Sequence, residues 1–256
     1  RIFSNVYTRQ ADINHSKYDL VIVDSYSSRS INVKSKVTSN TPFIGMFGYY
    51  NGPEVNRVLF SFHQMNRLLG YIKTENEINI LAKNSITISR EDLQVVNHID
   101  LPTKFTAIVL GGEWSYRTYN QWDKVIEKIL FNDKLTNFVF IGSSNAKDIA
   151  KKLVDQFSKS NTLDCVGRFS FNQTAQIIKQ AQILLCCDGG LMHAANAVNT
   201  PIVPLFARLT PQMQLTDSIC AFPLFDKSDV NNISPDNVLE KYRESVSFVD
   251  NHSQVE

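Results

Sequence analysis

The residues best suited to chemistry lie in one short segment, Asp188-Gly189-Gly190, with His193 just after it. A carboxylate, exposed backbone N–H groups and an imidazole can accept a hydrogen bond, bind an anion and carry a proton. Residues 183–187 before it are all apolar, which is typical of a strand buried on both faces of a parallel sheet. The alanine-rich stretch 191–198 then predicts a helix. Open α/β sheets bind ligands at such strand-to-helix turns, so the segment predicts an anion-binding site.

Two further glycine-bearing turns follow apolar runs in the same way. Gly111-Gly112 follows residues 106–110, and Gly142-Ser143-Ser144 follows residues 137–141. Because the carboxyl ends of parallel strands lie at one edge of a sheet, we expect the three turns to converge. The chain contains neither a P-loop motif nor a complete dinucleotide-binding fingerprint. Each turn alone is also consistent with simple turn chemistry, but together they favour a nucleotide or phosphate site.

The elements that must position these turns alternate along the chain. Apolar runs predict buried strands over 19–24, 42–47, 106–110, 137–141, 163–166, 183–187 and 202–206. Amphipathic periodicity and capping residues predict helices over 54–69, 121–130, 146–157, 170–181, 191–198 and 235–246, with another starting near Ser89. The serine-rich stretch 25–30 is interpreted as a polar loop. Repeated β–α units predict an α/β fold with a parallel, doubly wound sheet.

Composition excludes several classes of function. The 256 residues include 26 basic and 25 acidic side chains, so no charge excess points to nucleic acid. No apolar stretch approaches the roughly 20 residues of a membrane span. The histidines are scattered and the four cysteines lack C-x-x-C spacing, so we expect no metal site and reduced, buried thiols. The chain begins without Met and its first strand comes early, so we expect that the natural start is missing.

The segment Asp188-Gly-Gly-Leu-Met-His193, with Ala194-Ala195 and residues 199–206, resembles the signature of glycosyltransferase family 9, which includes the heptosyltransferases of lipopolysaccharide core assembly. The stretch from Gly111 to Arg117 resembles the family's phosphate-contact segment. The resemblance covers residues 104–207 and extends more faintly to residues 17–24.

The resemblance implies a GT-B-like architecture of two Rossmann-like domains, of which the N-terminal one is incomplete. Residues 1–100 would form the acceptor-side domain and residues 101–256 the nucleotide-sugar domain, with the last helix a candidate to return to the N-terminal domain. The family's reaction is an inverting, metal-independent transfer that needs no cofactor. The implied partners are a nucleotide-sugar donor, typically ADP-heptose, and a lipid-linked saccharide acceptor. The implied location is the cytoplasm, at most peripheral at the inner face of the inner membrane.

The resemblance also assigns roles to residues of this chain. Arg117 would neutralise the diphosphate leaving group, Asp188 would accept a hydrogen bond from the donor sugar, and His193 would lie one helical turn inside the site. The full set of implied donor-binding residues is Gly111, Arg117, Gly142, Ser144, Asp188, Gly189, Gly190, Leu191 and His193.

Several residues depart from the family pattern. Gly189 stands where the family has a hydroxyl residue, Leu191 where it has proline, and Arg117 where it has lysine. No segment before Tyr18 matches the one that carries the family's general base, an aspartate after the first strand. Asp24 and Glu113 are candidate substitutes, although an aspartate that ends a strand is commonly only a cap.

Three hypotheses about function follow. The first is an inverting glycosyltransferase that moves heptose or a related sugar from an ADP-sugar to a lipopolysaccharide core acceptor. The second is a catalytically inactive nucleotide-sugar-binding relative or partner subunit. The third is another GT-B enzyme, such as a nucleotide-sugar 2-epimerase, which would need its own set of carboxylates and histidines.

Overall fold

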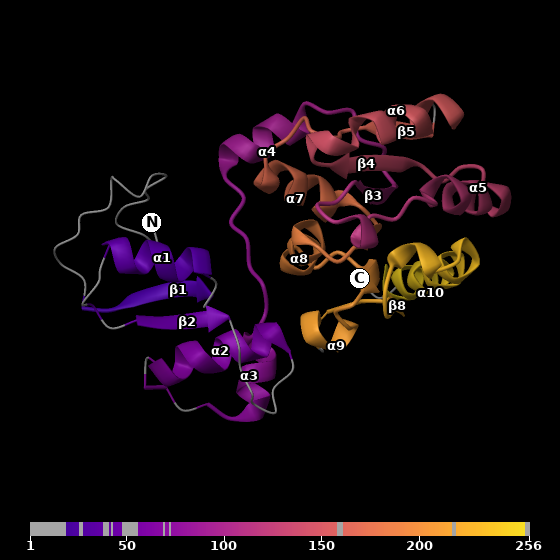
Figure 1. Cartoon of the computed structure of the whole chain (residues 1–256). Coiled ribbons are helices and arrows are strands. Elements are labelled where there is room, and N and C mark those ends of the chain that lie inside the picture. The colour runs from indigo at the N-terminus through magenta and orange to yellow at the C-terminus, as the bar shows by residue number, and fades with distance from the viewer. Residues whose placement is uncertain are drawn as a thin grey trace. The chain divides into compact units, whose positions relative to one another are not determined.

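The computed structural model describes residues 19–25, 28–37, 41, 43–47, 56–68, 70–71, 73–157, 161–216 and 219–253. The chain forms two compact units that divide between Ala82 and Lys83 (Figure 1). Residues 83–100, which the sequence analysis grouped with the N-terminal domain, belong to the C-terminal unit. They do so because helix α4 (Arg90–Asn97) packs against helix α7 (Phe171–Gln180).

The C-terminal unit is built on a six-stranded parallel sheet with the order β5-β4-β3-β6-β7-β8. Its chain order is therefore that of a dinucleotide-binding Rossmann sheet, with the first and fourth strands of the unit, β3 and β6, side by side at the centre. Successive strands are added towards one edge of the sheet from β3 to β5 and towards the other edge from β6 to β8. The β3–β6 pair is therefore the topological switch point. The strand bounds are β3 Thr106–Leu110, β4 Phe138–Gly142, β5 Thr162–Asp164, β6 Ile183–Cys187, β7 Ile202–Ala207 and β8 Leu224–Asp226.

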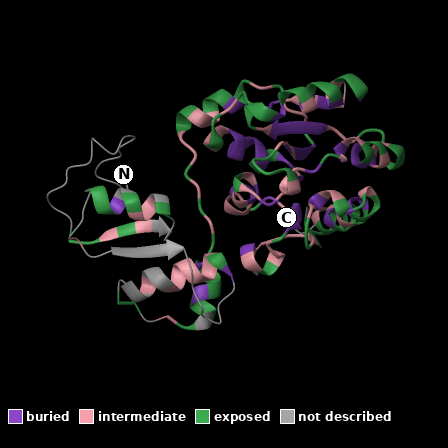
Figure 2. Cartoon of the chain, in the orientation of Figure 1, coloured by how far each residue is buried: buried purple, intermediate pink, exposed green. Residues whose placement is uncertain are grey.

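Helices cover both faces of this sheet, and the strands between them are almost wholly buried (Figure 2). One face packs against α5 (Trp122–Asn132), α6 (Lys147–Gln156) and α10 (Pro235–Ser253). The other packs against α4, α7 and α8 (Gly190–Ala197). In β6, Ile183 and Leu185 enter the first core and Leu184 and Cys186 the second, as strand alternation requires. The sequence of β6 is apolar at every position because the strand is buried on both faces.

Side-chain caps fix the start of two helices on the second face. Ser170 accepts a hydrogen bond from the backbone N–H of Gln173, whose side chain accepts one from the N–H of Ser170. Ser89 and Asp92 form the same reciprocal pair at the start of α4. Both starts agree with the sequence prediction, because a capping box is a local signal that needs no tertiary contact.

The N-terminal unit contains a parallel pair of strands, β1 (Val21–Ser25) and β2 (Phe43–Phe47). Its helices are α1 (Ser28–Val37), α2 (Arg57–Leu68) and α3 (Glu75–Leu81). The predicted polar loop over residues 25–30 is wrong at its end, since α1 begins at Ser28.

Four short elements complete the C-terminal unit. They are the 3-10 helices η2 (Ser115–Arg117), η3 (Ser144–Ala146) and η4 (Val230–Asn232) and the helix α9 (Pro211–Gln214).

All four cysteines are free thiols. Burial raises the pKa of Cys187 to about 12. Cys186, which faces the opposite core, also has a pKa raised by burial. These two thiols are therefore packing residues.

Candidate functional site

Three segments that follow neighbouring strands come together at the carboxyl edge of the sheet. They are the loop after β3, the loop after β4 and the turn from β6 into α8. The Asn145 side chain ties the first two, because its Nδ2 donates to the carbonyl of Gly112 at 3.0 Å. Arg117 ties the first to the third through an ion pair with Asp188. The structure thus brings Gly111, Arg117, Gly142 and Asp188 to the switch point.

Two of the predicted glycines are required by backbone geometry. Gly111 has φ 78° and Gly142 has φ 146°, a region that other residues rarely adopt. A side chain at Gly111 would also lie 2.9 Å from Asn145 Oδ1, and one at Gly142 would strike the carbonyl of Leu110. These two glycines let the loops after β3 and β4 approach each other closely.

Backbone geometry does not require glycine at either position of the Gly189-Gly190 pair. Gly189 has φ 171°, an extended conformation open to any residue. A Cβ on Gly190 would lie 3.5 Å from the ring of Phe171, an ordinary contact. The turn therefore does not need glycine. The absence of side chains instead leaves the first turn of α8 uncovered.

The centre of the site is an ion pair between Arg117 Nη1 and Asp188 Oδ2, 3.2 Å apart. The Asp188 side chain is 3% exposed and that of Arg117 is 23% exposed. A buried carboxylate needs such a partner, because an unpaired buried charge is costly. The backbone N–H of Asp188 donates to the carbonyl of Leu205 at 3.0 Å, which anchors the carboxylate to β7. Arg117 is therefore held at the sheet edge, with part of its side chain exposed to solvent.

The loop that carries Arg117 is braced by a residue that sequence reasoning missed, Asn231 on η4. Its Oδ1 accepts from the N–H of Asn120 at 2.8 Å, and its Nδ2 donates to the carbonyl of Thr118 at 3.0 Å. Tyr119 adds a buried hydrogen bond from its hydroxyl to the carbonyl of Ile233 at 3.0 Å. These bonds fix the three residues that follow Arg117 and so limit the positions open to its guanidinium.

The first turn of α8 lies directly after Asp188. Gly189 is the N-cap and makes no side-chain cap hydrogen bond. Its carbonyl accepts from the N–H groups of Met192 and His193, at 3.1 and 3.4 Å. The N–H groups of Gly190 and Leu191 precede these donors and point out of the helix end. A helix end of this kind favours an anion, through its free donors and its dipole.

His193 lies one turn inside α8, within hydrogen-bond distance of Asn84. Its Nδ1 is 3.2 Å from Nδ2 of Asn84, and an amide nitrogen can only donate. Nδ1 therefore accepts, which leaves the proton on Nε2. Burial lowers the pKa of His193, although the nearby Asp188 carboxylate acts to raise it. Nε2–H is thus available as a hydrogen-bond donor. Asn84 carries no motif of its own and was not foreseen.

The family model of glycosyltransferase family 9 (heptosyltransferase) matches residues 40–229. The chain belongs to that family. The matched range contains the Arg117–Asp188 pair, the start of α8 and the entire resemblance seen over residues 104–207, whereas Asn231 lies just beyond it. No match is found among curated protein sequences.

Solved structures of family 9 proteins share the fold. The glycosyltransferase family 9 protein from Veillonella parvula is 16% identical, with a TM-score of 0.66 over 90% of this chain and 74% of its own. E. coli heptosyltransferase WaaC with ADP is 14% identical, with a TM-score of 0.65 over 92% and 75%. E. coli ADP-heptose lps heptosyltransferase II is 16% identical, with a TM-score of 0.61 over 91% and 78%. The α/β, GT-B-like fold class is confirmed.

The other predicted residues of this family 9 chain to be placed are Ser144, Asp24 and Glu113. Ser144 is exposed at the start of η3, two residues after Gly142. Asp24 is part of β1 in the N-terminal unit, and its side chain lies outside the described residues, as do residues 1–18. Glu113 is exposed in the loop after β3. Within the described ranges, no group of three or more His, Cys, Asp or Glu side chains is placed to hold a metal ion. None of the helices described is long and apolar enough to cross a membrane.

A cavity of about 290 Å³ lies at the opposite, amino edge of the same sheet. It is lined by the starts of β3 and β6 and by α10, with Thr106, Gln182 and Tyr242 among its polar side chains. Burial raises the pKa of Tyr242, whose hydroxyl is 3.2 Å from that of Thr106. Ligands of open α/β sheets bind at the carboxyl ends of the strands, so this cavity is not the family's donor site.

Proposed function

We propose that this chain transfers a heptose or a related sugar from an ADP-sugar donor to a lipopolysaccharide core acceptor. The observation that carries the proposal is the Arg117–Asp188 pair at the switch point, beside the uncapped start of α8. Membership of family 9 gives the reaction class, glycosyl transfer. It favours this hypothesis over a nucleotide-sugar 2-epimerase.

The donor diphosphate fits the edge formed by the loop after β3 and the start of α8. The N–H groups of Gly190 and Leu191 would donate to its oxygens, and the partly exposed Arg117 side chain would lie beside them. Negative charge grows on the leaving diphosphate during transfer, so donors fixed in advance stabilise the transition state more than the ground state. Nε2–H of His193, one helical turn further along α8, would donate a hydrogen bond to the bound ADP-sugar.

Inverting transfer breaks the bond between the anomeric carbon and the diphosphate oxygen, whose electron pair leaves with ADP. The acceptor hydroxyl attacks the opposite face of that carbon and gives its proton to a general base. Asp24, near the carboxyl end of β1, is the candidate base among the residues of this chain. The acceptor is a lipid-linked saccharide, and we place the reaction on the cytoplasmic side of the inner membrane with at most peripheral contact.

The adenine nucleotide is the part of the proposal that is simplest to test. Calorimetric titration of the full chain with ADP, UDP and GDP is expected to give selective ADP binding. Arg117→Met should weaken that binding about tenfold or more, because a charged hydrogen bond to phosphate is lost. Lys128→Met is the matched control, since Lys128 pairs with Asp236 on the surface, 2.7 Å away, and not at the site.

A transfer assay then separates the enzyme from an inactive relative. The proposal predicts ADP release from ADP-heptose that depends on a lipopolysaccharide core acceptor. Selective ADP binding with no acceptor-dependent release would instead support a nucleotide-sugar-binding relative. Absence of binding to all three nucleoside diphosphates would overturn the donor assignment itself.

A further inference from the structure

Arg208 follows β7 with a backbone conformation that an arginine rarely adopts. Its φ is 67°, and the N–H of Leu209 donates to the carbonyl of Ala207 at 2.8 Å across it. A hydrogen bond that spans one residue with positive φ defines a tight γ-turn, which is strained for any residue other than glycine. Strained conformations of this kind gather at functional sites, so the residue calls for a function.

The turn places the Arg208 guanidinium on the aromatic ring of Tyr116. The Arg208 Cζ atom lies 3.7 Å from the ring centroid, a close cation–π contact. Tyr116 belongs to η2, the element that also carries Arg117, and η2 packs against β7. The Arg117 Cζ atom is 5.7 Å from the same centroid. Two guanidinium groups from different loops therefore gather around one ring, next to Asp188.

The two guanidinium groups differ in their charge partners. Arg117 is paired with Asp188. Among the described residues, Arg208 forms no ion pair with a carboxylate. Asp226, which lies opposite Ala207 in the sheet register, already accepts hydrogen bonds from Ser228, Asp229 and Asn232. Stacking uses the face of the Arg208 guanidinium and leaves its in-plane N–H groups available for another acceptor.

We infer that Arg208 is a second phosphate-binding residue of the donor site, with Tyr116 as its positioning residue. The inference rests on the proposed function, since it needs a nucleoside diphosphate at this edge. Asp188 balances the charge of Arg117, so that pair adds little net charge to attract a diphosphate. Arg208 supplies the uncompensated positive charge, at the end of the strand next to β6. An uncompensated positive charge of this kind attracts polyanionic ligands.

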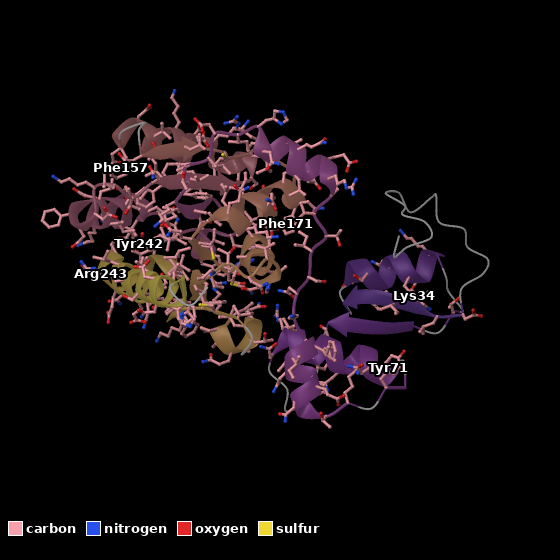
Figure 3. All side chains as sticks on the ribbon, turned by 180° about the vertical axis from the view of Figure 1, so that it is seen from behind. Lys34, Tyr71, Phe157, Phe171, Tyr242 and Arg243 are labelled. Carbon is pink, nitrogen blue, oxygen red and sulfur yellow. The ribbon has the colours of Figure 1, made fainter. Side chains whose placement is uncertain are left out.

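Four variants of the full chain test this inference by calorimetric titration with ADP, AMP and adenosine. Arg208→Gly removes the guanidinium and relaxes the turn, because glycine accepts positive φ at no cost. Tyr116→Leu removes the ring on which Arg208 stacks, and Tyr116→Phe keeps it. Arg243→Ala is the matched control. Arg243 lies on α10, where its side chain donates a hydrogen bond to the Asn132 side chain (Figure 3).

The expected result depends on the number of phosphates. Arg208→Gly should weaken the binding of ADP about tenfold or more, weaken the binding of AMP less and leave the binding of adenosine unchanged. The thermal stability of this variant should stay equal or rise. Tyr116→Leu should weaken the same ligands in the same order as Arg208→Gly. The double variant should bind ADP little more weakly than Arg208→Gly alone, since both changes act through one guanidinium. Tyr116→Phe should keep most of the affinity for ADP, and Arg243→Ala should leave it unchanged.

Three outcomes would overturn the inference, and they can be told apart. If the unaltered chain binds ADP and Arg208→Gly binds it equally well, Arg208 does not contact the diphosphate, and the proposed function stands. If the unaltered chain binds no nucleoside diphosphate, both the inference and the donor assignment fail. An equal loss for ADP and adenosine would likewise exclude a phosphate contact.

Discussion

Removing either partner of the Arg117–Asp188 pair is expected to have unequal effects on stability. Arg117→Met leaves the Asp188 carboxylate, 3% exposed, without a partner. Breaking a buried pair in this way costs about 3 kcal/mol of unfolding free energy. Asp188→Asn leaves Arg117, which is 23% exposed and can be hydrated. That change should cost about 1 kcal/mol, the range of a partly exposed pair.

The double variant removes both charges of the pair. Arg117→Met with Asp188→Asn leaves no buried charge, so it should be more stable than Arg117→Met alone. Urea unfolding followed by tryptophan fluorescence is a suitable assay, because both tryptophans, Trp114 and Trp122, lie in the C-terminal unit. A shift of the urea midpoint by about 1 M or more is expected for Arg117→Met. Equal costs for the two single variants, or additive costs in the double, would refute the asymmetry.

Three further predictions concern the same unit, and urea unfolding checks each of them. Gly142→Ala should cost more than about 3 kcal/mol, since its φ of 146° and the carbonyl of β3 both oppose a side chain, whereas Gly190→Ala should stay within about 0.5 kcal/mol. Tyr119→Phe should cost about 1–2 kcal/mol, because it leaves the buried carbonyl of Ile233 without its donor. Stability should fall as pH drops below about 6.5 towards the lowered pKa of His193, because only the unfolded chain binds that proton in this window. His193→Gln should reduce this slope, and an unchanged slope would contradict the argument.

The sheet and its helices could be predicted because their signals are local. The central strands are buried on both faces, so β3 and β6 appear as continuous apolar runs, and both strands begin and end at the predicted residues. Capping boxes such as that of Ser170 mark helix starts within four positions of sequence. The carboxyl-edge location of the turns then followed from the parallel arrangement alone.

Other features depend on contacts that the sequence does not display. The edge strand β8 has only three residues, and its Phe225 is 44% exposed, so no buried apolar run marks it. The Arg117–Asp188 pair joins positions 71 residues apart, and Asn84 and His193 are 109 apart. Such pairings depend on loop conformation, which the γ-turn at Arg208 illustrates, since arginine gives no sequence signal for positive φ.

A crystal structure of the chain with bound ADP is the most direct test of where the donor binds. We predict that the diphosphate lies at the carboxyl edge, within hydrogen-bond distance of the N–H groups of Gly190 and Leu191 and beside Arg117. Density for ADP in the cavity at the amino edge, against Tyr242, would contradict the account, as would a diphosphate that contacts neither α8 nor η2.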